Sequence, residues 1–144
     1  MNNTKLFIIL GNQLFNPNLY FKQINQYDFF LCEDYGLCSY VKHHKLKLLH
    51  VLSAMRLYKD ELKSLGLKVH YNSIEDENFY EDYLEKLKKI LSKNKYKKLF
   101  FFEIEDKFFE KKLLTLNKDV EIKVVKSPMF LFSRNEFNEA IKKN

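Results

Sequence analysis

The side chains best suited to binding a metal ion gather in the first half of the chain. Cys32 and Cys38 lie shortly before three histidines, His43, His44 and His50. Zinc sites usually pair two cysteines about two to four residues apart, or two histidines about four apart on one helical face. None of the spacings here fits either pattern. We therefore expect structural or surface roles for these residues, and no metal site.

The signatures of nucleophilic catalysis and of phosphate binding are missing from the sequence. There is no G-x-S-x-G segment, and neither cysteine has a local catalytic signature. The turn after the first apolar run reads LGNQLFNP, which holds one glycine and matches neither the dinucleotide fingerprint nor the P-loop. These observations argue against a serine or thiol hydrolase and against a conventional NAD or ATP site.

Carboxylates and amides at the ends of apolar runs are the remaining candidates for chemistry. If these runs are parallel strands, their carboxyl ends meet at one edge of the sheet, where such sheets bind ligands. Carboxylates at that edge can do acid–base work, although helix caps and loop positions are the commoner use of such residues. The polar residues at these ends are Asn12, Gln13, Glu33, Asp34, Ser73, Glu75, Glu103, Glu105 and Ser127.

The elements that would position these side chains alternate between strands and helices. The strand runs are apolar through their centres, as expected when helices cover both faces of a parallel sheet. This alternation predicts a single α/β domain over 1–144, with a mainly parallel five-stranded sheet. Strands are expected over 5–10, 28–33, 68–72, 98–104 and 121–126, and helices over about 42–65, 77–93 and 106–116 and after Ser133, while 11–27 is ambiguous.

Local signals predict where the helices begin and end. Gly66 follows the longest helix where a left-handed C-terminal cap would lie, and Asp76 is the expected N-cap of the next. Ser133 and Glu136 have capping-box spacing at the start of the last helix. The longest helix has Arg56 on its polar flank and turns an apolar stripe to the sheet, made of Leu48, Val51, Leu52, Met55, Tyr58, Leu62 and Leu65.

Composition and charge limit the partners that the chain is expected to have. The net charge of +6 permits an anionic partner, but the lysines are scattered over 42–47, 86–98 and 111–112, which predicts only weak, salt-sensitive, sequence-independent contact with DNA. No apolar segment approaches the length of about 18 residues that suggests a membrane span, and the first run is too short for a signal peptide. The expected location is cytoplasmic, with reduced thiols and no membrane contact.

Four segments taken together resemble one protein family. They are IILGNQL (8–14), HKLKLLHVLSAMRLYKDELKSLGLKVHY (44–71), FFFEIED (100–106) and SPMFLFSRNEF (127–137). This pattern resembles the N-terminal domain of the deoxyribodipyrimidine photolyase-related proteins, the bacterial cryptochrome and photolyase branch that carries an iron–sulfur cluster. The block from Leu52 to Arg56 is its most specific part. The resemblance implies a Rossmann-like three-layer sandwich of the photolyase N-terminal type.

The resemblance also implies what this chain does and lacks. In the family, FAD, the 4Fe-4S cluster and the lesion pocket belong to a larger helical domain, which is absent here, so we expect a domain fragment or a stand-alone short relative. The chain would then be a scaffold associated with light-dependent DNA repair by lyases, without catalysis of its own. Members can hold an antenna pigment, of ribolumazine type in the characterised branch, against this domain. They commonly show Asp where this chain has Asn12, which affects any contact made there.

We expect any small ligand to bind in the crevice where the strand order reverses, lined by the loops after the first, second and fourth strands. Two other readings remain open. The chain can be a small nucleotide-binding enzyme that uses the strand-end carboxylates, or an interaction module that docks a separately encoded flavin-binding helical domain. The latter predicts an exposed apolar patch on the C-terminal helices. The expected cofactor-binding residues are Gly11, Asn12, Gln13, Cys32, Glu33, Glu103 and Glu105.

Overall fold

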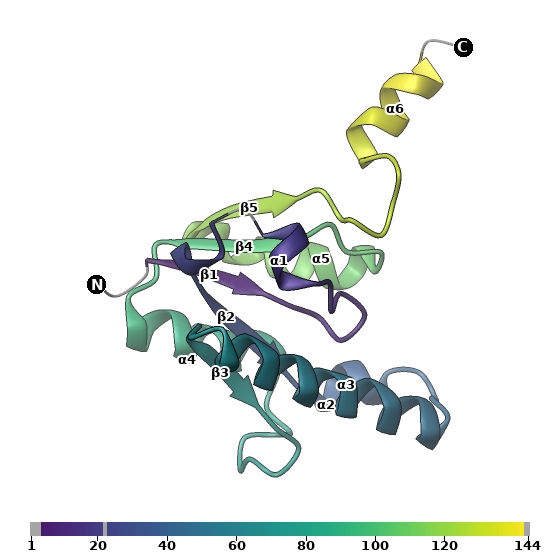
Figure 1. The fold of residues 1–144 in the computed structure, drawn as a ribbon. Coiled ribbons are helices and arrows are strands. Elements are labelled where there is room, and N and C mark those ends of the chain that lie inside the picture. Colours follow the sequence, from purple (N-terminus) through teal and green to yellow (C-terminus); the bar gives the residue numbers. More distant parts are fainter. Residues whose placement is uncertain (1–3, 22, 143–144) are drawn as a thin grey trace.

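The core of the molecule is a five-stranded sheet in which every neighbouring pair of strands is parallel (Figure 1). The computed structural model describes residues 4–21 and 23–142. The strand order is β3-β2-β1-β4-β5, so the chain moves outward from β1 in one direction and then returns to its other side. The strands are β1 (Lys5–Ile8), β2 (Tyr27–Cys32), β3 (Val69–Asn72), β4 (Lys98–Phe102) and β5 (Glu121–Val125).

Helices connect the strands and cover both faces of the sheet. Among the described residues they are α1 (Pro17–Tyr20), α2 (Tyr35–Ser39), α3 (Lys45–Ser64), α4 (Tyr83–Asn94), α5 (Lys107–Leu114) and α6 (Arg134–Lys142), with short 3-10 helices at Ile24–Gln26 and Thr115–Lys118. None of these helices is long and apolar enough to cross a lipid bilayer. The described part of the segment 11–27, which the sequence left ambiguous, contains α1 and the first 3-10 helix.

Alternate residues of the central strands point to opposite faces and form two separate cores. On one face, Phe7 and Phe29 pack with Met55 and Leu62 of α3 and with Phe21 after α1. On the other face, residues such as Leu6 and Phe30 pack against α4 and α5. The result is helix, sheet and helix in three layers, which confirms the predicted Rossmann-like α/β sandwich.

The longest helix, α3, ends where the sequence predicts. Gly66 has a φ of +77°, which glycine adopts without strain, and the Leu67 amide donates to the Leu62 carbonyl beyond it. The helix begins at Lys45 rather than 42, because His44 caps it by accepting a hydrogen bond from the Leu46 amide. The stripe facing the sheet is also shorter than predicted, since Leu65 is exposed.

The capping residues of the later helices are only partly those predicted. Ser133 and Glu136 form the predicted capping box, in which each side chain accepts from the amide of the other residue. Asp76 was expected to cap a helix starting near 77, but α4 starts at Tyr83 and is capped by Asp82. Asp76 instead accepts a hydrogen bond from the Ser73 amide within a turn, so its carboxylate has a backbone partner although it caps no helix.

The packing of α3 on the sheet gives a direct stability test. Met55 is 3% exposed in the core, whereas Leu57 on the same helix is 72% exposed. Met55→Asp would place an unpaired carboxylate in that core, at a cost of several kcal/mol against a total stability of about 5–15 kcal/mol. We expect Met55→Asp to abolish cooperative thermal unfolding followed by circular dichroism. Leu57→Asp is the matched control and should melt like the parent; equal losses would mean that α3 is rotated from this orientation.

Candidate ligand-binding site

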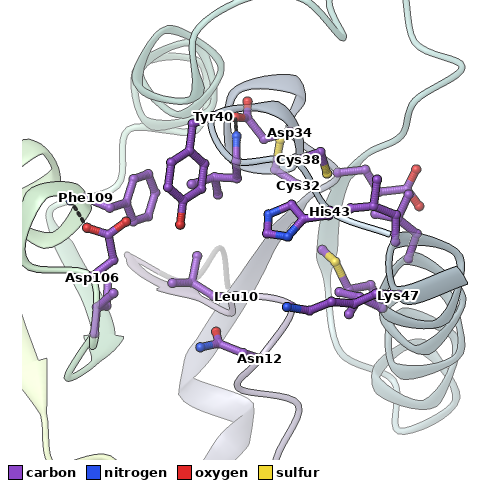
Figure 2. Close-up of a pocket in the computed structure, with 18 of the residues that line it drawn as sticks. Leu10, Asn12, Cys32, Asp34, Cys38, Tyr40, His43, Lys47, Asp106 and Phe109 are labelled. Atoms are coloured by element: carbon purple, nitrogen blue, oxygen red, sulfur yellow. Dashed lines mark hydrogen bonds between the residues drawn. The ribbon is translucent and has the colours of Figure 1, made fainter. Parts of the chain in front are cut away.

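A cavity of about 290 Å³ opens at the carboxyl ends of the strands, beside the first half of α3 (Figure 2). It lies between the chain after β1, the end of β2 and the loop after β4. β2 and β4 flank β1 on opposite sides, so this is the point where the strand order reverses. Its lining is mainly apolar and includes Leu10, Leu37, Leu48, Val51, Leu52, Met55, Ile104 and Phe109.

Gly11 lets the end of β1 approach α3 closely. A Cβ atom at this position would lie 2.8 Å from Val51 Cγ1 and 3.0 Å from Met55 Sδ. Both contacts are tighter than ordinary van der Waals packing, so a side chain here would force the Val51 and Met55 side chains to shift. The single glycine of LGNQL therefore has a packing role in the structure.

Glu33 is held in place by four donors at the end of β2. Arg56 binds it in a fork, with Nε donating to Oε1 at 2.7 Å and Nη2 donating to Oε2 at 3.0 Å. The Tyr71 hydroxyl donates to Oε1 at 2.5 Å and the Ile74 amide donates to Oε2 at 2.9 Å. Arg56 also reaches Glu75 at 3.3 Å. The pair therefore ties α3 to β2, β3 and the loop after β3.

These contacts decide the ionisation of Glu33. Burial is the largest influence and favours the neutral acid, but the hydrogen bonds from Arg56, Tyr71 and Ile74 together outweigh it. The pKa of Glu33 is consequently lower than that of a free glutamate. An ionised carboxylate whose oxygens are already engaged positions its surroundings and is a poor general acid or base.

Asp34 is neutralised by a lysine that the sequence reasoning missed. Lys86 of α4 is fully buried, and its Nζ donates to Asp34 Oδ2 at 3.0 Å and to the Phe79 carbonyl at 2.7 Å. The other Asp34 oxygen caps α2 by accepting from the Leu37 amide. Lys86 was assigned to a solvated basic segment, yet it follows Tyr83 by three residues and so shares its buried face of α4.

The two thiols beside the cavity are unreactive in this environment. Burial raises the pKa of Cys32 to about 12, and burial also raises the pKa of Cys38. Both therefore stay protonated at neutral pH, and the thiolate is the form that attacks substrates or binds metals. Within 4–21 and 23–142, no group of three or more histidine, cysteine or acidic side chains is arranged to hold a metal ion.

The structure brings most of the predicted site residues together. Five of them, Gly11, Asn12, Cys32, Glu33 and Glu105, line the cavity, and the Asn12 amide donates to Glu105 at 2.8 Å. The two others do not line it. Gln13 is buried and donates to the Glu103 carbonyl, while the Glu103 side chain borders a separate hollow beside the C-terminal segment. Their contact with any ligand stays a prediction.

The opposite wall of the cavity comes from residues that the sequence reasoning did not assign to a site. Tyr40 and His43 belong to the segment that leads from α2 into α3, Lys47 belongs to the first turn of α3, and these side chains point into the cavity (Figure 2). Asp106 and Phe109 enter from the start of α5. The run KHHKLK (42–47) could have indicated this wall, because it places basic residues next to the apolar stripe of α3.

The Arg56 contact predicts a pH-dependent loss of stability. Arg56→Ala removes two charged hydrogen bonds from Glu33 and should lower the free energy of unfolding by about 1–3 kcal/mol at neutral pH. A depressed pKa stabilises the fold above the unfolded value of about 4.3, and this contribution is lost as the pH falls through the folded value. The difference between parent and variant should therefore shrink in acid.

Urea unfolding at a series of pH values measures this difference. Lys88→Ala is the control, because Lys88 makes only a surface pair with Glu85. A constant difference between parent and Arg56→Ala across the acid range would contradict the role given to Glu33.

Comparison with known proteins identifies the family of this chain. A stretch of 75 residues, which is 51% of this chain, is 37% identical to a (6-4) photolyase of Agrobacterium fabrum. The match covers 15% of that protein, so this chain corresponds to a small part of its length. The model of the deoxyribodipyrimidine photo-lyase-related protein family matches residues 7–144. Since that match takes in nearly the whole sequence, the chain belongs to the deoxyribodipyrimidine photo-lyase-related protein family.

Proposed function

We propose that this chain is the N-terminal α/β domain of a photolyase-related protein and holds a small planar pigment in the cavity beside α3. The pigment would collect light for a flavin bound elsewhere, in a helical domain of the same or a separate chain. The observation that carries the proposal is an apolar cavity at the switch point of the sheet, whose carboxylates already have partners within the protein.

The state of the carboxylates favours binding over catalysis. Glu33 and Asp34 are paired with Arg56 and Lys86, and Asp106 caps α5 by accepting from the Phe108 and Phe109 amides. A general acid or base needs an oxygen free to reach the substrate, and both oxygens of Glu33 and of Asp34 are already engaged. The chain also has only two cysteines, too few for a cluster held by four thiolates. Repair chemistry is thus assigned to another domain.

Binding of a ribolumazine or of riboflavin tests the proposal. Chemical-shift mapping should place the perturbed amides around Gly11 and Val51, at the cavity wall. Leu48→Trp should weaken binding at least about tenfold, because Leu48 lines the cavity and the larger ring fills it. The matched variant Leu49→Trp changes an exposed neighbour outside the cavity and should bind like the parent. Perturbations confined to the β3 edge of the sheet would sink the assignment.

A second function is favoured by the apolar C-terminal segment. α6 stands away from the sheet (Figure 1), and none of its residues is buried. We propose that this segment docks the helical flavin domain, which would cover its exposed side chains. They are Met129, Phe130, Leu131, Phe132, Phe137 and Ile141.

Sedimentation velocity with the helical domain of a photolyase-related protein tests the docking. Leu131 is 91% exposed, and Leu131→Asp should weaken the association about tenfold or more if this residue is buried at the interface. Phe108→Asp is the matched control, because Phe108 on α5 is 90% exposed outside this segment. Equal effects of the two substitutions would contradict docking at the C-terminal segment.

A further inference from the structure

The side of α3 that faces away from the sheet carries apolar side chains that stay exposed. Leu46, Leu49 and Leu57 are 61%, 62% and 72% exposed. On α4, by contrast, none of the large apolar side chains is exposed, as expected for a helix with a single apolar stripe. α3 therefore has a second apolar stripe, in addition to the one that contains Met55 and Leu62 and packs on the sheet.

The spacing of the exposed leucines places them on one line along the helix. Leu49 lies four residues before Ser53 and Leu57 lies four residues after it, so the three side chains share one face of the helix. Leu46 belongs to the same face, and Ser53 has the smallest side chain of the four. We call these four residues the outer face of α3. A small side chain between two leucines lets a second helix approach closely at that point.

Charge favours a second helix that runs in the opposite direction. A half-turn about an axis beside Ser53 brings Lys45, near the start of α3, close to Asp60, near the end of a second copy. The Asp60 side chain is 66% exposed and pairs at the surface with its neighbour Lys59 at 3.1 Å, so its carboxylate stays open to a second cation. A parallel pair would instead bring like charges together at both ends, which is unfavourable.

The length of α3 allows such a contact but limits its strength. The 20 residues of the helix span about 30 Å. A single pair of helices of this length buries less than the roughly 1,200 Å² of a stable interface, so we expect association in the micromolar range. The outer leucines do not line the cavity, which is therefore left open by a helix packed on this face.

We propose that the outer face of α3 binds a second copy of this chain, with the two helices antiparallel and the two-fold axis beside Ser53. Leu49 of each copy contacts Leu57 of the other, and Lys45 of each lies near Asp60 of the other. Both copies use the same surface, so the contact closes as a dimer. It does not rest on pigment binding or on docking of the helical domain, which use the inner side of α3 and the C-terminal segment.

Sedimentation equilibrium of the purified chain tests the dimer. The parent should dimerise in the micromolar range, and Leu49→Ser should weaken the association at least about tenfold, because each dimer loses two buried leucines. Leu19→Ser is the matched control, since Leu19 of α1 is 74% exposed outside this face. A parent that stays monomeric up to about 1 mM, or equal effects of the two substitutions, would overturn the proposal. A monomeric parent whose binding to the helical flavin domain is lost in Leu49→Ser would assign the face to that domain and likewise overturn it.

Disulfide trapping tests the direction of the two helices. In the antiparallel pair the two copies of position 53 face each other within reach of a disulfide, whereas the two copies of position 64 are about 33 Å apart. Oxidised glutathione should therefore link Ser53→Cys into a covalent dimer, above the level given by the parent with its own two cysteines. Ser64→Cys is the matched control, an exposed serine on the same side of α3, and should not be linked. Equal linking of the two variants, or none in either, would overturn the antiparallel dimer.

Discussion

The bidentate contact between Arg56 and the buried Glu33 is the interaction on which the site depends. It joins the middle of α3 to the end of β2, and through Tyr71 and Ile74 to β3 and the loop that follows it. Gly11 then brings the chain after β1 against the same helix. With α3 fixed in this way, its first half stands beyond the carboxyl ends of the strands and becomes a wall of the cavity.

The pairing of buried carboxylates with cations of the protein also favours ligand binding over catalysis in this domain. Of the four carboxylates that line the cavity, Glu33 and Asp34 each have a cation of their own, Arg56 on α3 and the buried Lys86 on α4. Burial also keeps Cys32 protonated. The rest of the lining is mainly apolar surface, which suits a flat molecule and offers no activated nucleophile.

The parts of this structure that follow from local pattern could be predicted, and those that follow from distant contacts could not. Apolar runs located all five strands, and Gly66 marked the end of α3, because both signals are read within a few residues.

The failures concern side chains whose partners the local sequence does not reveal. Asp76 was mistaken for a helix cap because an aspartate can accept a backbone hydrogen bond in a turn equally well. Lys86 looked solvated because its partner Asp34 lies 52 residues away in sequence. Gln13 and Glu103 follow strands that flank the cavity, but they bond to each other beside it, a choice that strand ends alone do not reveal.

A crystal structure of the chain grown with saturating riboflavin tests the central claim most directly, which is that the cavity beside α3 is the ligand site. The account predicts ordered density for the ring between Val51 of α3 and Phe109 of α5. Density for the ring in the hollow beside Phe130 and Arg134, with the α3 cavity empty, would contradict it.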